Sequence, residues 1–89
     1  MEDSNAQILD YDAMTALAEH CRDLVRELNP DRDPVVGLDI DAGEMDLAIA
    51  DALDALSVIP GAASWIPKEV VALTHNPVYT DIYRFNGVF

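Results

Sequence analysis

The chain carries few side chains that could perform catalysis, and they form no catalytic pattern. Its one cysteine, Cys21, directly follows His20, so on a helix the two side chains point about 100° apart and cannot form a local thiol–imidazole pair. Cys21 also lies among apolar residues at helical spacing, where burial raises the pKa of a thiol. We therefore expect Cys21 to be an inert core thiol and His20 to face solvent near Asp23.

The second histidine and the clustered acids predict no metal site. His75 falls in the last turn of a predicted helix, where its charged form would favour the exposed carbonyl groups. Asp39, Asp41 and Glu44 bring three carboxylates together. A calcium loop starting at Asp39 would need glycine at position 44 and glutamate at position 50, where the chain has Glu44 and Ala50. The sequence predicts no bound metal and no cofactor.

Other chemistries are also missing their essential residues. Small acidic helical domains invite comparison with acyl carrier proteins, whose prosthetic group is attached to a serine that opens the second helix. Here residues 39–43 read DIDAG, and the nearby Ser57 is at the other end of the predicted helix. There is no glycine-rich phosphate loop and no glycine-flanked serine. We therefore predict no catalytic residues and no enzyme activity.

Charge is the strongest feature of the sequence. The chain has 17 acidic and 5 basic residues, and its net charge of -12 lies wholly within residues 1–60. This balance excludes direct binding to nucleic acid, because the phosphates would be repelled. Proteins of GC-rich or salt-adapted organisms also contain many aspartates and few lysines. The sequence leaves open whether the acidity is functional or reflects such a bias.

The sequence predicts a cytoplasmic protein that makes no contact with a membrane. A single cysteine excludes an internal disulfide and fits a reducing compartment. The opening residues, MEDSNAQ, lack the basic and apolar regions of a secretory signal. The longest uncharged run, residues 55–67, is too short to cross a bilayer as a helix.

Apolar residues recur at steps of three and four over residues 14–28, which predicts the first helix. Asp10 or Asp12 can accept hydrogen bonds from the free amides of its first turn. The Asn-Pro pair at 29–30 should end the helix, because the residue before proline is driven out of the α region. Residues 1–10 are expected to be a frayed lead-in.

Residues 29–41 contain proline and glycine and are predicted to form a long linker, with a short extended segment that packs across the helices. Asp41 and Glu44 have the spacing of a capping box in front of an alanine-rich apolar run. A second helix is therefore expected from Ala42 to about Ile59, where a Pro-Gly pair follows.

Two further elements are expected near the end of the chain. A third helix is predicted over residues 66–75, with a proline in its first turn and an Asn-Pro pair after it. The aromatic C-terminal segment, residues 77–89, is ambiguous, because Tyr79, Tyr83 and Phe85 fit a short strand. Apolar residues at helical spacing and a following glycine describe a short fourth helix equally well, and we favour the helix.

These elements predict a single all-α, or mostly α, domain over residues 1–89. It should be a small bundle of three to four helices with one long linker. A chain of this length builds only one core, which argues against two domains with a deep cleft between them. Since 51% of the residues are apolar, the chain should fold despite its charge.

The predicted second helix offers a candidate binding surface. One arc of it must face the core, while the opposite arc mixes acids with aliphatic residues, Ala50 among them. Acids would steer a basic partner and aliphatics would add buried area. The predicted partner-binding residues are Glu44, Asp46, Leu47, Asp51, Asp54 and Val58. The alternative is that the C-terminal aromatics cover Leu47 and Val58 as a second layer of core.

We therefore expect a non-enzymatic acidic protein-binding module whose partner is a protein with a basic surface. It would act as an inhibitor or decoy, a nucleic-acid mimic in charge, on a positively charged surface of a larger protein. It is similar in kind, though in no motif, to acidic phage inhibitors of restriction or CRISPR enzymes. The alternative is a small structural subunit or assembly adaptor that docks through its aromatic C-terminal segment. Homo-oligomerisation is left open.

Overall fold

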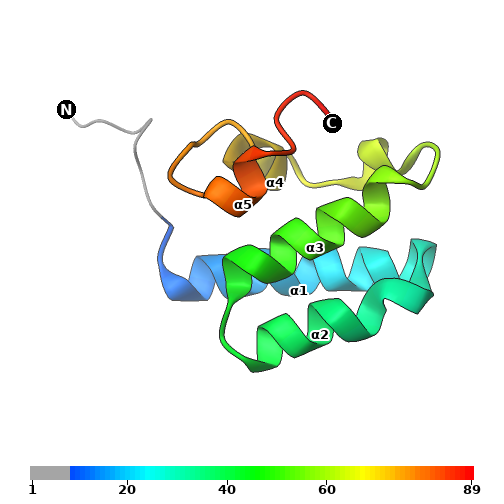
Figure 1. Ribbon diagram of the computed structural model, residues 1–89, viewed down its shortest axis with the longest axis horizontal. Helices are drawn as coiled ribbons and strands as arrows, with labels where there is room; N and C mark the ends of the chain where they lie inside the picture. The colour runs from blue at the N-terminus through cyan, green and yellow to red at the C-terminus, as the bar shows by residue number, and fades with distance from the viewer. Residues whose placement is uncertain (1–8) are drawn as a thin grey trace.

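The computed structural model describes residues 9–89 and confirms the expected all-α fold. Its body consists of α1 (Tyr11–Leu28), α2 (Asp33–Asp41) and α3 (Met45–Ser57), which all contact one another. In Figure 1, α1 and α3 lie against each other, and α2 and the C-terminal part flank α3 on opposite sides. Within the described residues there is no strand, and no helix is long and apolar enough to span a membrane.

The first helix has the ends that the sequence indicated. Oδ1 of Asp10 accepts a hydrogen bond of 2.8 Å from the Ala13 amide, so Asp10 is the N-cap. At the other end, the side-chain amide of Asn29 donates to the Ala55 carbonyl at 2.9 Å and ties the end of α1 to α3. The buried side of α1 consists of Met14, Ala18, Cys21 and Val25. Most of the expected lead-in, residues 1–8, lies outside the described residues.

The expectation of an extended linker over residues 29–41 is wrong. This segment forms a short 3-10 helix, η2 (Pro30–Arg32), followed directly by α2. Pro34 lies in the first turn of α2, where its missing amide hydrogen removes no helical hydrogen bond. Gly37 lies in the middle of α2 and is buried, so it allows a close approach between helices instead of breaking the helix. The bundle therefore gains a helix where a linker was expected.

The helix that was predicted to start at Ala42 is α3. It starts at Met45 instead, because α2 continues to Asp41. The expected capping box does not form, since Glu44 is itself the N-cap and makes no side-chain capping bond. The turn between the helices passes through Gly43 at a φ of 79°, a conformation that glycine adopts without steric cost. The helix ends at Ser57, close to its predicted end.

α3 is the central helix of the core. Because α1, α2 and α5 all contact it, it is buried on more than one side. Its buried residues are Met45, Ala48, Ile49, Ala50, Ala52, Leu53, Ala55 and Leu56. Ala50 was expected on the outer arc, and that expectation is wrong because the unforeseen α2 covers part of this arc.

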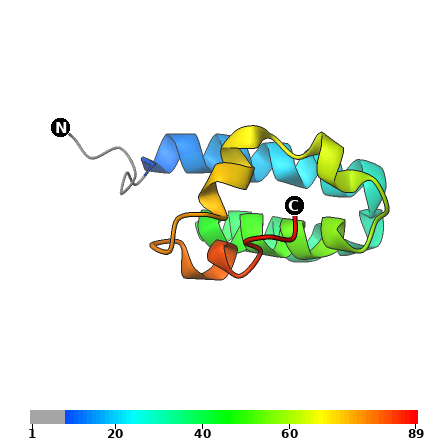
Figure 2. The ribbon, with the colours of Figure 1, turned by 90° about the horizontal axis from the view of Figure 1, so that it is seen from above.

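The C-terminal part lies across α1 and α3, as Figure 2 shows. It consists of η3 (Ala62–Trp65), α4 (Lys68–Leu73) and α5 (Thr80–Tyr83). The third predicted helix is thus present as α4 but is shorter than residues 66–75. The favoured choice of helix over strand for the C-terminal segment is confirmed by α5.

The C-terminal segment supplies aromatic residues to the core. Tyr79, Ile82 and Phe85 are buried, and the Phe85 ring is tilted against the Phe89 ring with their centroids 6.3 Å apart. The hydroxyl of Tyr79 accepts a 2.8 Å hydrogen bond from the Leu9 amide, far away in the sequence. The segment therefore belongs to the folded domain and also holds the start of the described chain.

Candidate functional site

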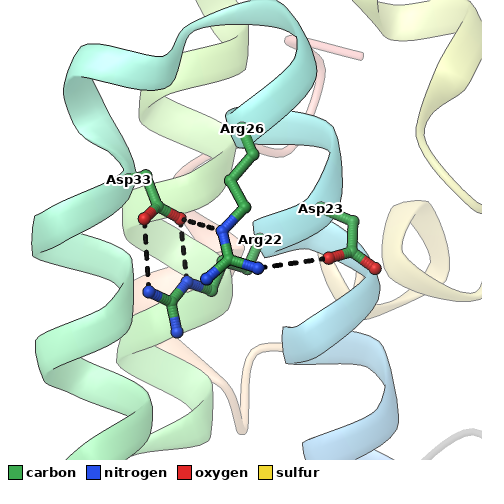
Figure 3. A network of polar contacts seen from close by, with 4 residues as sticks. All are labelled: Arg22, Asp23, Arg26 and Asp33. Carbon is green, nitrogen blue, oxygen red and sulfur yellow. Dashed lines mark hydrogen bonds and ion pairs between the residues drawn. The ribbon is translucent and has the colours of Figure 1, made fainter.

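A network of charged side chains fixes α2 on α1. Nε and Nη2 of Arg22 donate to the two carboxylate oxygens of Asp33 at 2.8 and 3.2 Å. Nε of Arg26 lies 3.2 Å from the same carboxylate, and its Nη1 lies 3.8 Å from Asp23, as Figure 3 shows. The hydrogen bonds from Arg22 hold the pKa of Asp33 below its usual range, and the positive charges of both arginines add to the effect. Asp33 therefore stays ionised and joins the two helices.

The Arg22 guanidinium also lies directly over Gly37 of α2. A Cβ atom at position 37 would come within 2.6 Å of Nη2 of Arg22. The glycine thus leaves the space in which the arginine reaches Asp33. This explains why a glycine occurs in the middle of a helix, where it normally costs about 1 kcal/mol relative to alanine.

A second ion pair joins η2 to α3. Nη2 of Arg32 donates to Oδ2 of Asp54 at 2.6 Å, and the Asp54 side chain is 47% exposed. Residues 1–60 contain three arginines and no lysine, and the arginines are Arg22, Arg26 and Arg32. Each of these arginines is bonded to an aspartate between helices. The arginines of residues 1–60 therefore all form ion pairs between helices.

The structure divides the predicted partner-binding residues into three groups. Glu44 and Asp46 are exposed at the start of α3, beside the half-buried Leu47. Val58 lies just beyond the other end of α3 and is 66% exposed, so the C-terminal aromatics do not cover it. Between these ends, the two remaining aspartates of the set are half-buried. The most accessible acids of the predicted surface are therefore those at the start of α3.

Asp51, the remaining residue of the predicted set, interacts with Asp39 of α2. The pKa of Asp39 is raised to about 7, chiefly by burial and further by hydrogen bonding to Asp51 and by repulsion from Asp51 and Glu44. Oδ2 of Asp39 is buried, and no described residue donates a hydrogen bond to it. When protonated, the Asp39 carboxyl group can donate to Asp51. Near neutral pH Asp39 is therefore partly protonated at the contact between α2 and α3.

The acids near this carboxyl pair were the candidate metal ligands of the sequence. The sequence brought Asp39, Asp41 and Glu44 together as potential oxygen ligands. In the structure, no group of three or more acidic, histidine or cysteine side chains within residues 9–89 is arranged to hold a metal ion. The pair is instead a contact between two helices whose strength depends on pH.

A groove beside α1 was not foreseen. It lies between α1 and η3, has a volume of about 480 Å³, and is lined by His20, Asp23, Leu24, Glu27, Leu28 and Trp65. Trp65 is 64% exposed, and the two leucines are half-buried. The sequence signal was the repeated pairing of an acid with a leucine, at 23–24 and 27–28. Only the fold reveals that a tryptophan lies beside them.

Cys21 and His20 lie where the sequence predicted, but His75 does not lie in the last turn of a helix, because α4 ends at Leu73. Cys21 is fully buried, and burial raises the pKa of its thiol to about 12. His20 is exposed. His75 is also exposed, beyond the end of α4, and its Nδ1 lies 3.1 Å from the side-chain amide nitrogen of Asn86. These positions form no nucleophile and base pair.

Comparison with known proteins gives no match, since no family model, no curated protein and no solved structure resembles the chain. The described surface offers two features that could bind another molecule. One is the set of exposed acids at the start of α3, and the other is the groove beside Trp65.

Proposed function

We propose that this protein is a non-enzymatic acidic binding module that occupies a positively charged surface of a larger partner protein, as an inhibitor or decoy does. The observation that carries the proposal is the separation of charges. Arg22, Arg26 and Arg32 are bonded to aspartates between the helices. The acids on the outer surface therefore project a negative field that these arginines do not balance.

Exposed acids occur on all three body helices and in the segments that join them. Within residues 9–60 they are Asp10, Asp12, Glu19, Asp23, Glu27, Asp31, Asp41, Glu44 and Asp46. A field of one sign speeds the encounter with a surface of opposite charge, and it also rejects acidic partners and nucleic acid. This combination suits a protein that competes with nucleic acid for a basic surface.

The start of α3 is the contact surface that we propose for this function. Glu44 and Asp46 are exposed and lie next to the partly buried Leu47, so charge and aliphatic area are both available there. Asp54 is less suited to a test, because reversing its charge would also break its ion pair with Arg32. Asp51 is likewise unsuited, because it takes part in the carboxyl pair.

The proposal is tested by recovering the partner with matched variants. The wild type, Glu44→Lys/Asp46→Lys and Glu69→Lys/Asp81→Lys are each immobilised and exposed to a lysate of the source organism. The two double variants change the net charge equally, and Glu69 and Asp81 are exposed on the C-terminal part. We expect a basic protein that the wild type and the second variant retain and the first variant loses. Equal retention of every recovered protein by all three would refute the proposed surface.

The alternative function, an assembly adaptor, is supported by exposed apolar residues of the C-terminal segment. Val78, Tyr83 and Val88 are 52%, 41% and 53% exposed. Truncation cannot test this alternative, since the same segment supplies Tyr79 and Phe85 to the core. Replacing the three exposed residues by serine leaves the core intact. A partner lost by that variant and kept by Glu44→Lys/Asp46→Lys would favour the adaptor function.

A further inference from the structure

We propose that the groove between α1 and η3 anchors a cationic segment of the partner protein, with an arginine side chain stacked on Trp65 and its guanidinium bonded to Asp23 and Glu27. This inference rests on the proposed function, because it assumes a partner with a basic surface. It goes beyond that function by naming a second contact, remote in sequence from the start of α3, and the side chain that it would hold.

The position of Trp65 is fixed although its ring is exposed. Ala62, at the start of η3, and Ile66, directly after Trp65, are only 2% and 7% exposed, so both are inserted into the core. Gly61, at a φ of 82°, turns the chain just before η3. The backbone that carries the exposed indole is therefore anchored by buried neighbours. A tryptophan on an anchored backbone has only its two side-chain torsions to order when a partner covers it, which makes it an effective anchor.

The other walls of the groove combine apolar and acidic side chains. Leu24 and Leu28 are half-buried and add aliphatic surface next to the indole. Asp23 and Glu27 are spaced i and i+4, so their carboxylates project from the same face of α1, and both are exposed. Glu19 lies one turn earlier on the same face and extends the negative row.

These walls select one kind of occupant. An arginine offers a flat cation that stacks on an indole and donates hydrogen bonds to carboxylates in the same plane. Its aliphatic stem, and an apolar neighbour in the same segment, would cover the two leucines. A purely apolar occupant would desolvate Asp23 and Glu27 without compensation. A second copy of this chain, with its own net charge of -12, would be repelled.

The intramolecular contacts leave these acids available. Arg26 lies nearest to Asp23, but at 3.8 Å, and its Nε is directed at Asp33 at 3.2 Å. The Arg26 side chain is thus oriented by the stronger contact with α2, as Figure 3 shows. A partner guanidinium would therefore meet a row of carboxylates with little competition from residues 9–89.

Trp65 is the only tryptophan of the chain, so its fluorescence reports on the groove directly. The probe is a short amphipathic peptide that alternates arginine pairs with leucine pairs, and a matched peptide carries glutamine in place of arginine. With the arginine peptide we expect a blue shift of the emission and protection from acrylamide quenching. The glutamine peptide should cause neither change. Absence of any change with the arginine peptide at low salt would overturn the proposal.

Calorimetry of variants separates the groove from general charge attraction. Asp23→Asn/Glu27→Gln and Asp81→Asn/Glu69→Gln each remove two negative charges, the first pair inside the groove and the second outside it. We expect the groove variant and Trp65→Ser to weaken binding of the arginine peptide about 10-fold or more, and the other variant to weaken it about twofold at most. Equal weakening by the two double variants would show diffuse attraction only and would refute the anchor.

The partner recovered with the α3 variants separates this inference from the proposed function. A partner that Glu44→Lys/Asp46→Lys loses but the groove variant retains unchanged would support the proposed function. The same result would refute the groove as part of the interface. A partner that neither variant affects would argue against both. Loss of the same partner with either variant is the expected result.

Discussion

Replacing Asp39 by asparagine should stabilise the protein above neutral pH. In the wild type, burial and the neighbouring Asp51 disfavour the charged form of Asp39 and raise its pKa to about 7. At about pH 8 the folded protein must therefore hold two negative carboxylates close together between α2 and α3. The amide of the variant carries no charge and can donate to Asp51, as the protonated acid does at lower pH.

The size of the effect follows from the change in pKa. A rise from the ordinary 3.8 to about 7 is equivalent to ~4 kcal/mol between the two protonation states. Asp39 is half-buried and not fully enclosed, so water reaches part of the side chain and screens the repulsion. We therefore expect Asp39→Asn to raise the free energy of unfolding by about 1–2 kcal/mol at about pH 8.

The sign of the pH dependence follows from the same change. The pKa of Asp39 is higher in the folded state than in the unfolded chain, so the folded state retains the proton longer as the pH rises. The stability that this group contributes is complete below about pH 4 and is lost as the pH rises through about 7. Wild-type stability should thus fall between about pH 5 and 8, and most of that fall should be absent in Asp39→Asn.

Urea titrations of the wild type and variants at several pH values between about 5 and 8 test this account. Asp51→Asn should have an effect of the same sign but smaller, because it relieves the repulsion and leaves Asp39 buried, which is the larger cause of its raised pKa. Asp31→Asn is the matched control, since it removes one charge from an exposed position of η2, and it should change stability by less than about 0.5 kcal/mol. If Asp39→Asn is less stable than the wild type at about pH 8, or if its pH dependence is unchanged, ionised Asp39 does not destabilise the folded protein and the reasoning is refuted.

Three further outcomes are expected. The fully buried Cys21 should not react with Ellman's reagent until denaturant is added, and rapid labelling would contradict its place in the core. Gly37→Ala should lower the free energy of unfolding by about 1 kcal/mol by displacing Arg22 from Asp33, but should raise it by about 0.5–1 kcal/mol in an Arg22→Ala background, where only helix propensity remains. Urea titration of the four proteins decides this, and an equal effect in both backgrounds would exclude the contact. The melting temperature should rise with salt up to about 0.1 M as the repulsion among exposed acids is screened, whereas a fall would mean that attractive ion pairs dominate.

A helix could be predicted where apolar residues recur on one face and where capping or proline residues mark both of its ends. α1 has both, with Asp10 as its N-cap and an Asn-Pro pair after it. α2 has no such pattern, since Val35 and Leu38 are exposed whereas Val36 is buried. Its helical form is supported by contacts with α1 and α3 that are distant in the sequence, including the ion pair of Asp33. The local spacing of apolar residues does not predict such long-range contacts.

The same reason limits the prediction of the candidate site. Asp51 and Asp54 were predicted to point away from the core, but α2 and η2 pack against α3 and supply a partner to each side chain, Asp39 to Asp51 and Arg32 to Asp54. Trp65 could be recognised as a candidate contact residue, yet not as a wall of a groove on α1. That position depends on the turn after α3, which brings η3 back along the first helix.

Whether the exposed acids drive binding can be measured from the association rate of the recovered partner as a function of salt, by biolayer interferometry. For the wild type, we predict that association slows at least about 10-fold between about 50 and 300 mM salt. Glu44→Lys/Asp46→Lys should associate slowly at every salt concentration, and Glu69→Lys/Asp81→Lys should follow the wild type. Association that is insensitive to salt and unchanged in Glu44→Lys/Asp46→Lys would contradict the account of this protein as an acidic module for a basic surface.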